Sequence, residues 1–368
     1  MTVDVVISGF GVLSAFGFGG PALVDGVFSG TPGFRTVTRF DVSGQACDQA
    51  ATYEPGDPAP TTFDALVTCA EAAVEMARRP DRATLPLIAG TKVRASSLEP
   101  EPPAELTEQV ARRLGLGTPR RTFVNACCAG ANAIIHAAQL VRAGVATTAL
   151  AGGAFLVDRQ AFSLFAANFA LATDGRLRPF DQDRTGVLLG DGAAVLVVES
   201  AASAAARGAP PLARIAGWAM TDDAHHVAQP KPDGAGTAAA IGQALGRAGV
   251  APAQVTYVNA HGTGTLLNDS AEAAALHTAF GPAVGDVFVS STKSTTGHAL
   301  EGSGALEAVI TALAVRDATL PPTAGLNRPD REHPLRHVRE PRRVAVQYAL
   351  SLNSSVGGLN TALLLGAA

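Results

Sequence analysis

The chain has 368 residues, of which 47% are hydrophobic and only 16% are charged, so it can bury a large core in one big domain or two fused halves. Its net charge of −4 shows no basic excess that would indicate nucleic-acid binding. No run of about 18 uncharged apolar residues predicts a membrane span, and the N-terminus lacks the basic segment of a signal peptide.

Short β-rich apolar segments alternate with helical patterns along the chain. The predicted strands are 3–7, 85–90, 121–126, 147–151, 193–199, 255–260 and 286–290, with two more near 343–352 and 361–365. Helical periodicity covers 130–143, 236–248 and 303–316. Loops are expected at 53–62, 95–104 and 327–343, which are rich in proline, acid or arginine. This alternation predicts an α/β fold with a parallel sheet covered on both faces.

The four cysteines are Cys47, Cys69, Cys127 and Cys128, and none has CxxC or Cys/His metal spacing. Free thiols in a cytoplasmic protein are the simplest interpretation. The adjacent residues His225 and His226 follow two aspartates, but we interpret this segment as an ordinary polar loop and expect no metal site.

Residues 123–133 (FVNACCAGANA) join an apolar strand directly to a helix. Cys127 therefore lies near a helix N-terminus, where unpaired N–H groups and the helix dipole favour a thiolate. The same groups could stabilise an oxyanion on an acyl group bound to the sulfur. The alternative interpretation is that Cys127 and Cys128 are small core residues, because free cysteines are commonly buried.

A second strand leads into the glycine-rich segment 261–265 (HGTGT). Ligand sites in parallel α/β sheets lie beyond the carboxyl ends of the strands, so His261 is a candidate functional residue. The hydroxyl groups of Thr263 and Thr265 could contact a polar ligand. The alternative is a glycine turn with a capping histidine.

A third strand leads into 290–298 (SSTKSTTGH). Lys293 is one of only three lysines among 28 basic residues, and either Glu307 or the pair Asp269 and Glu272 could neutralise it. The alternative is a surface loop in which Lys293 and His298 have no role. One cysteine and two histidines at the ends of different strands would form a nucleophile with a two-donor carbonyl clamp, which predicts thiol-based acyl chemistry.

These segments together resemble the β-ketoacyl synthase family of the thiolase superfamily. The sequences NACCAG (125–130), HGTGTLLNDSAE (261–272) and KSTTGH (293–298) are similar to its three catalytic motifs. Further matches are ISGFGV (7–12), RPFDQDRTGVLLGDGA (178–193) and SLNSSVGGLN (351–360). The resemblance runs in family order from residue 3 to about 365. It implies a thiolase-like fold, in which two pseudo-duplicated βαβαβαββ halves form a five-layer αβαβα sandwich.

The resemblance also implies a division of the chain and a role for each site residue. Residues 1–208 would form the half with the nucleophile, and residues 209–368 the half with both histidines and the lysine. Cys127 would accept the acyl group. His261 and His298 would bind the thioester carbonyl of the extender unit. The remaining implied residues are Lys293 paired with Glu307, the oxyanion-hole N–H groups of Cys127 and Val356, the substrate-binding Thr263, Thr265, Gly357 and Gly358, and the supporting Asp269 and Glu272.

The implied activity is decarboxylative Claisen condensation of an acyl-cysteine intermediate with a malonyl-type thioester. The resemblance implies no metal or redox cofactor, because the substrates would be carried on the phosphopantetheine of an acyl carrier protein or on CoA. It implies a cytoplasmic homodimer, or a heterodimer with a second ketosynthase-like chain, without nucleic-acid or membrane partners. The arginine pairs 112–113, 120–121 and 342–343 are candidate contacts for an acidic carrier protein, or simply solvated surface.

The sequence departs from the family pattern around the expected acyl pocket. Only about thirty residues (91–120) separate the strand at 85–90 from the nucleophile strand, where the family has a longer segment. The individual departures are Cys128 and Ala129 for two serines, Ser354 and Val356 for two phenylalanines, Ala228 for a threonine and Glu301 for a glycine. They favour a specialised, polyketide-like role. They also leave two alternatives open, a ketosynthase-fold acyltransferase that makes an ester or amide, and a partner subunit of a ketosynthase heterodimer.

Overall fold

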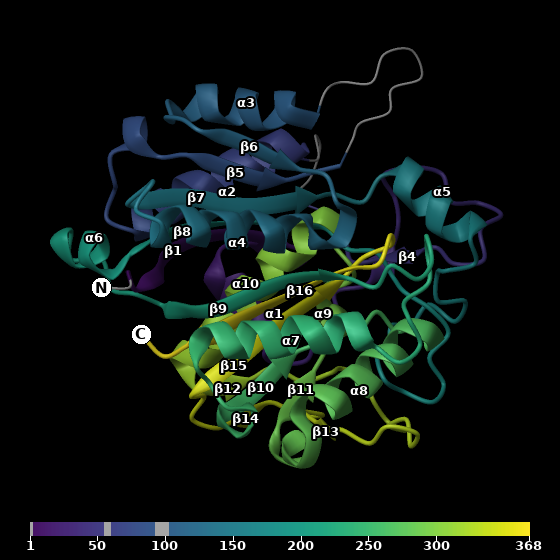
Figure 1. Cartoon of the computed structure of the whole chain (residues 1–368). Helices are drawn as coiled ribbons and strands as arrows, with labels where there is room; N and C mark the ends of the chain where they lie inside the picture. Colours follow the sequence, from purple (N-terminus) through teal and green to yellow (C-terminus); the bar gives the residue numbers. More distant parts are fainter. Residues whose placement is uncertain (1–2, 55–59, 93–102) are drawn as a thin grey trace.

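The computed structural model describes residues 3–54, 60–92 and 103–368 (Figure 1). Its longer strands are β1 (Val5–Ser14), β5 (Leu87–Gly90), β6 (Arg120–Phe123), β7 (Thr148–Phe155), β8 (Gly192–Ser200), β9 (Ala213–Asp222), β10 (Val255–Asn259), β11 (Phe288–Ser290), β15 (Tyr348–Ser354) and β16 (Leu359–Gly366). Two-residue strands are β2 (Gly17–Phe18), β3 (Arg35–Thr36), β4 (Gln49–Ala50), β12 (Thr319–Leu320), β13 (Arg336–His337) and β14 (Arg342–Arg343).

The α-helices are α1 (Gly20–Val27), α2 (Thr62–Met76), α3 (Pro103–Leu114), α4 (Ala129–Arg142), α5 (Arg159–Ala167), α6 (Ala201–Ala206), α7 (Ala235–Ala248), α8 (Leu266–Phe280), α9 (Lys293–Thr296) and α10 (Leu300–Asp317). Short 3₁₀ turns are η1 (Arg82–Thr84), η2 (Ala126–Cys128), η3 (Pro252–Gln254) and η4 (Gly281–Asp286). The three predicted helices correspond to α4, α7 and α10. None of the helices in the described residues is both long and apolar enough to cross a membrane.

One sheet of 12 strands runs through the described part of the chain, in the order β13-β11-β10-β15-β16-β9-β1-β8-β7-β5-β6, with β2 beside β1. Strands from the first 200 residues occupy one end, and strands from residue 213 onward occupy the other. The two groups join where β1 meets β9, through the pairs Val6–Arg214 and Ile7–Ala213. Because this junction is so short, the helices between the two groups must supply much of the contact between them.

The sheet is mixed, so the prediction of a parallel sheet was wrong. Parallel pairs join β5 to β6 and β7, and β10 to β11 and β15, but β1, β8, β9 and β16 pair antiparallel with their neighbours. Only residues 355–358 connect β15 to β16, and so short a connection forms a hairpin rather than a parallel crossover. Gly357 and Gly358 have φ angles of +92° and +88°, which glycine adopts most readily.

The layers follow from which helices contact which strands (Figure 1). Helix α2 packs on β1 and β8, with α3 beside it, on one outer face. Helices α4 and α10 lie in the middle, where α10 contacts β7 and β8 on one side and β15 and β16 on the other. Helix α7 covers β9 and β16 on the second outer face, with α8 against it. The two ends of the single sheet therefore act as two β layers with α4 and α10 between them, which confirms the predicted αβαβα order.

Helix α10 is buried from residue 300 to residue 315. It crosses α4 at glycines that leave no room for side chains. A Cβ atom on Gly130 would lie 2.9 Å from both the Ala305 nitrogen and the Glu301 oxygen, and one on Gly304 would lie 2.4 Å from the Ala131 nitrogen. The crossing therefore brings the N-terminal end of α4 against the first turns of α10.

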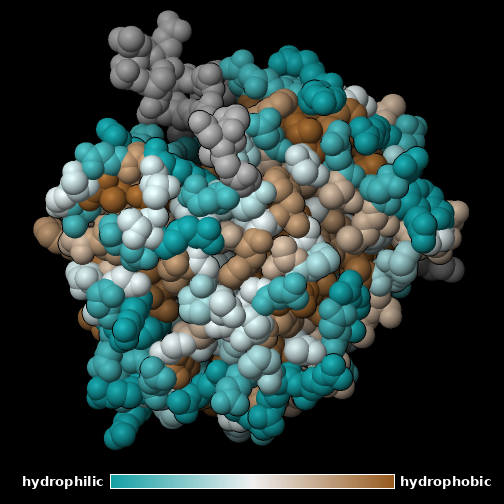
Figure 2. All heavy atoms as spheres, turned by 180° about the vertical axis from the view of Figure 1, so that it is seen from behind, coloured by the Kyte–Doolittle hydropathy of each residue, from teal (hydrophilic) through white to brown (hydrophobic). Residues whose placement is uncertain are grey.

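Some predicted loops lie partly outside the described residues, namely 55–59 of the segment 53–62 and 95–102 of the segment 95–104. Helix α3 then begins at residue 103, inside the predicted loop. The segment 327–343 is irregular apart from β13 and β14, as expected. Figure 2 shows the face opposite to that of Figure 1, where hydrophobic and hydrophilic side chains are mixed.

Candidate active site

The nucleophile candidate lies at a strained turn between β6 and α4. Ala126, just before Cys127, has a φ of +49°, a left-handed conformation that costs about 1–2 kcal/mol for a residue with a Cβ atom. Cys127 itself lies in η2, two residues before the first residue of α4, and is only 7% exposed. The structure therefore places this cysteine at the strand–helix junction expected from the sequence.

Cys127, His261 and His298 meet although they come from three separate segments. His298 Nε2 lies 3.1 Å from Cys127 Sγ. The rings of His261 and His298 pack edge to face with their centroids 5.3 Å apart. Among the described residues, His261 Nδ1 has no hydrogen-bond partner.

The protonation states of this group follow from burial. Burial, with the nearby positive charge of Lys293, lowers the pKa of both histidines well below the usual value, so both imidazoles are neutral near pH 7. Burial and the Glu301 carboxyl raise the pKa of Cys127 to about 12, so the resting sulfur is a thiol. The thiol therefore has to be activated within the site.

Ser303 is a site residue that sequence reasoning missed. Its Oγ lies 2.9 Å from His298 Nδ1. When the serine hydroxyl donates to Nδ1, the imidazole proton is on Nε2 and points toward the sulfur or a substrate oxygen. The opposite tautomer makes Nε2 an acceptor for the thiol proton. Ser303 lies five residues after His298 in the first turn of α10, whereas His298 precedes that helix, so helical spacing could not have identified the pair.

Lys293 is fully buried and pairs with Glu307 on α10, not with Asp269 or Glu272. Asn353, which the sequence analysis did not single out, donates a 2.5 Å hydrogen bond from Nδ2 to the second Glu307 oxygen. This network fixes the charge of Lys293 close enough to both histidines to lower their pKa values.

Glu272 and Asp269 instead hold the loop that carries His261. The Glu272 carboxylate accepts backbone hydrogen bonds from His261 at 2.7 Å and from Gly262 at 2.8 Å. Asp269 accepts one from Gly264 at 3.2 Å and another from Phe180 at 2.8 Å. Both carboxylates thus lie where the sequence analysis expected a supporting network.

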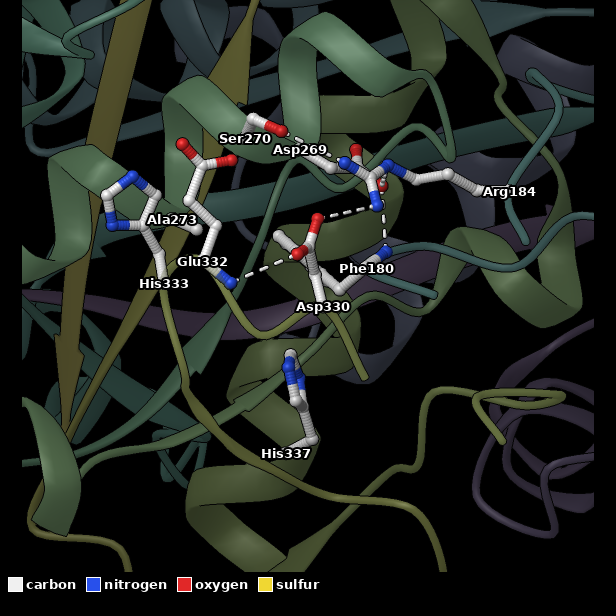
Figure 3. Close-up of a pocket in the computed structure, with 9 residues that line it drawn as sticks. All are labelled: Phe180, Arg184, Asp269, Ser270, Ala273, Asp330, Glu332, His333 and His337. Carbon is white, nitrogen blue, oxygen red and sulfur yellow. Dashed lines mark hydrogen bonds and ion pairs between the residues drawn. The ribbon is translucent and has the colours of Figure 1, made fainter. Parts of the chain in front are cut away.

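The polar network continues into a small pocket behind this loop (Figure 3). Arg184 donates hydrogen bonds to Asp330 and to the Ser270 hydroxyl, each at 2.9 Å, and its Nε lies 3.8 Å from Asp269. Arg184 therefore joins the segment 178–193 to α8 and to the irregular segment after β12.

His337, in the same pocket, should make stability depend on pH. Burial and Arg339 lower its pKa to about 4, so the unfolded chain binds a proton below about pH 6.5 that the folded chain does not bind. The free energy of unfolding therefore decreases as the pH is lowered from about 6.5 to about 4. When the pH is lowered from 7 to 5, the free energy of unfolding of wild type, measured with urea, should fall by about 1–2 kcal/mol more than that of His337→Phe. Parallel pH profiles for the two proteins would contradict this assignment.

The loop between β15 and β16 lies against the nucleophile. Ser355 Oγ donates to the Asn125 carbonyl at 3.3 Å, and Gly357 N–H donates to Val227 at 2.8 Å. The Val356 side chain is 62% exposed, and within the described residues its N–H donates to no acceptor. The Val356 N–H is thus available beside the cysteine loop. Gly358 is buried and Gly357 is exposed.

The remaining predicted ligand residues lie at the start of α8. Thr263 is buried, Thr265 is half-buried, and their hydroxyls are 2.9 Å apart. His226 Nδ1 accepts two backbone hydrogen bonds at 3.1 Å each, from Ala228 and Gln229, so it is a loop residue. No group of three potential metal ligands occurs in the part of the chain that the structure describes.

A cysteine with two histidines at the centre of a five-layer sandwich is the arrangement of a thiolase-like condensing enzyme. The model of the beta-ketoacyl synthase N-terminal domain matches residues 72–204, and that of the C-terminal domain matches residues 212–327. The chain belongs to the β-ketoacyl synthase family.

Individual relatives agree with this assignment. The chain is 34% identical to a 3-oxoacyl-[acyl-carrier-protein] synthase 2 from Synechocystis sp. over 402 aligned positions, covering 98% of this chain and 97% of the relative. Among solved structures, the ishigamide ketosynthase/chain length factor is 31% identical with a TM-score of 0.92, over 100% of both chains. A ketosynthase in complex with its chain length factor from Xenorhabdus doucetiae is 26% identical with a TM-score of 0.85, covering 100% of this chain and 98% of that one.

Proposed function

We propose that this protein is a β-ketoacyl-(acyl-carrier-protein) synthase, which condenses an acyl group held on Cys127 with a malonyl-type thioester. The observation that carries the proposal is the 3.1 Å contact between Cys127 Sγ and His298 Nε2, with the ring of His261 against the same imidazole. A nucleophile with two adjacent N–H donors is what acyl transfer followed by enolate formation requires.

The reaction begins when the Cys127 sulfur attacks the acyl thioester. The C–S bond to the carrier breaks, and the proton of the Cys127 thiol ends on the departing sulfur, which leaves as the carrier thiol. A malonyl thioester then loses CO2, and the electron pair of the broken C–C bond moves onto an enolate oxygen that His261 and His298 stabilise. The enolate carbon attacks the acyl-Cys127 carbonyl, whose oxyanion accepts hydrogen bonds from the N–H groups of Cys127 and Val356. Collapse of this intermediate expels the Cys127 thiolate. No step needs a metal or redox cofactor.

The proposed substrates are thioesters of acyl carrier protein or of CoA. The name of the Synechocystis relative mentions an acyl carrier protein for that protein. Thr263, Thr265, Gly357 and Gly358 are proposed to contact the pantetheine arm. A specialised, polyketide-like pathway is supported by the 31% identity to the ishigamide ketosynthase/chain length factor. The four cysteines are free thiols, which supports a cytoplasmic location.

A second ketosynthase-like chain, identical or different, is the proposed protein partner. Strand β6 is the last strand at its end of the described sheet, so one of its edges is unpaired. Val124, directly after β6, is 47% exposed, which adds an apolar side chain beside that edge. We also propose that residues 1–208 and 209–368 form the two thiolase-like halves, since their strands occupy opposite ends of the sheet.

The test is to incubate the purified protein with acyl and malonyl carrier proteins and to measure CO2 and ketoacyl product. The wild type should yield both, and Cys127→Ala should yield no ketoacyl product. Acyl-Cys127 without CO2 release would instead support an ester- or amide-forming acyltransferase. If a co-purified complex kept full activity with Cys127→Ala, the chemistry would belong to its partner subunit.

A further inference from the structure

Glu301 is a buried acid that the proposed reaction does not use. It lies in the first turn of α10 and is only 8% exposed. Its Oε2 atom is buried and accepts a hydrogen bond from none of the described residues. A buried polar atom without a partner destabilises the folded state, so its presence requires a compensating role.

The Glu301 carboxyl lies near the nucleophile. The backbone oxygen of this residue lies against Gly130, three residues after Cys127, where an added Cβ atom would be only 2.9 Å away. Burial and the same carboxyl raise the pKa of Cys127. Leu300, the residue before it, packs in the same apolar cluster as Cys127 and Phe155. The backbone oxygen of Glu301 also faces Gly153 in β7, where a Cβ atom would lie only 2.5 Å away.

The charged groups around Glu301 do not form a hydrogen bond with it in the described structure. Lys92, after β5, lowers the pKa of Glu301, but its ammonium group pairs with Asp158 and lies 5.7 Å from the centroid of the Phe155 ring. Beyond this ion pair, Phe155 at the end of β7 and Leu300 belong to the apolar cluster of Cys127 and form an apolar wall beside it. Glu301 adds a hydrogen-bonding carboxyl to that wall.

We propose that Glu301 is a specificity-determining residue, whose free carboxyl oxygen hydrogen-bonds an oxygen-bearing group on the acyl chain attached to Cys127. The inference rests on the proposed acylation of Cys127. It names the substrate class as acyl thioesters with a hydroxyl or oxo group within the first few carbons, rather than saturated hydrocarbon chains.

The protonation of Glu301 suits both kinds of oxygen. Burial raises its pKa, so this carboxyl takes up a proton more readily than an exposed glutamate does. A neutral carboxyl can accept a hydrogen bond from a hydroxyl and can donate one to an oxo group. A saturated chain would leave the carboxyl without a partner, and that penalty produces discrimination.

The experiment compares hexanoyl, 3-hydroxyhexanoyl and 3-oxohexanoyl thioesters of N-acetylcysteamine. Intact-mass spectrometry follows acylation of wild type, Glu301→Gln and Glu301→Leu. Wild type should acylate about tenfold faster with the oxygenated chains than with hexanoyl, the order expected for one buried hydrogen bond. Glu301→Gln should keep most of this preference because its amide still hydrogen-bonds, and Glu301→Leu should lose it.

A stability measurement shows whether the leucine variant is a fair comparison. Removing an unpaired buried acid should raise the melting temperature of Glu301→Leu by a few degrees, so lost preference would not reflect misfolding. Equal rates for all thioesters in wild type would overturn the inference while leaving the proposed function intact. A uniform rate change across the panel in Glu301→Leu would also overturn it, because Glu301 would then act on the thiol. No adduct with any thioester would overturn both proposals.

Discussion

Replacing Glu307 by glutamine is expected to lower the free energy of unfolding by about 3–5 kcal/mol, the cost of leaving a buried charge without its partner. Lys293 is fully buried, and its ammonium group pairs with the Glu307 carboxylate. Glutamine has nearly the same shape but cannot neutralise the charge. Urea unfolding should show a lower midpoint with an unchanged slope, as expected when stability alone changes.

The matched control replaces both members of the pair. Lys293→Met combined with Glu307→Leu removes both charges and keeps a similar volume, so it should regain most of the stability lost in Glu307→Gln. Condensation should stay impaired in this double variant, because the positive charge beside the histidines is gone. If Glu307→Gln were as stable as wild type, Lys293 would not carry a buried charge.

Replacing His298 by alanine is expected to separate the two chemical steps. Release of CO2 should fall by about 10²–10³-fold, because one of two donors to the enolate oxygen is lost. Acylation of Cys127 forms no enolate and should fall less than about tenfold. The measurement pairs intact-mass detection of acyl-Cys127 with labelled CO2 from a malonyl thioester.

Ser303→Ala is the matched control for this prediction. This variant keeps the His298 imidazole but removes the hydroxyl group that lies 2.9 Å from its Nδ1 atom. CO2 release should fall by about 10–100-fold, which is the usual effect of losing an orienting hydrogen bond. If His298→Ala slowed acylation as much as CO2 release, His298 would act as the base for the thiol and not as an enolate donor.

The positions of the principal site residues could be predicted because each lies in a segment that leads from a strand to a glycine or to a helix. Cys127, His261 and His298 all have that signal, and the structure brings them together. The partner of Lys293 could not be settled from the sequence, because several acids lay at comparable positions. Only the packing of α10 against β15 places Glu307 and Asn353 on the lysine.

Two fold predictions failed for physical reasons. Strand β9 was missed because its sequence, ARIAGWAMTD, is dominated by alanine, glycine and polar residues instead of β-branched ones. It forms because β16 and β1 pair with it on its two sides. The antiparallel pairs were missed because hydrophobicity patterns reveal a buried strand but not the direction of its neighbour.

The glycine crossing of α4 and α10 has a consequence for how the protein can evolve. Cys127 precedes one helix, His298 precedes the other, and the backbones touch at Gly130 and Gly304. The 3.1 Å sulfur-to-nitrogen distance is therefore set at the centre of the molecule, independently of the outer helices and connecting loops. Those outer parts can lengthen, shorten or acquire new partners while the reacting atoms stay in register. Substitution at either glycine should be far less tolerated than insertion into a peripheral loop.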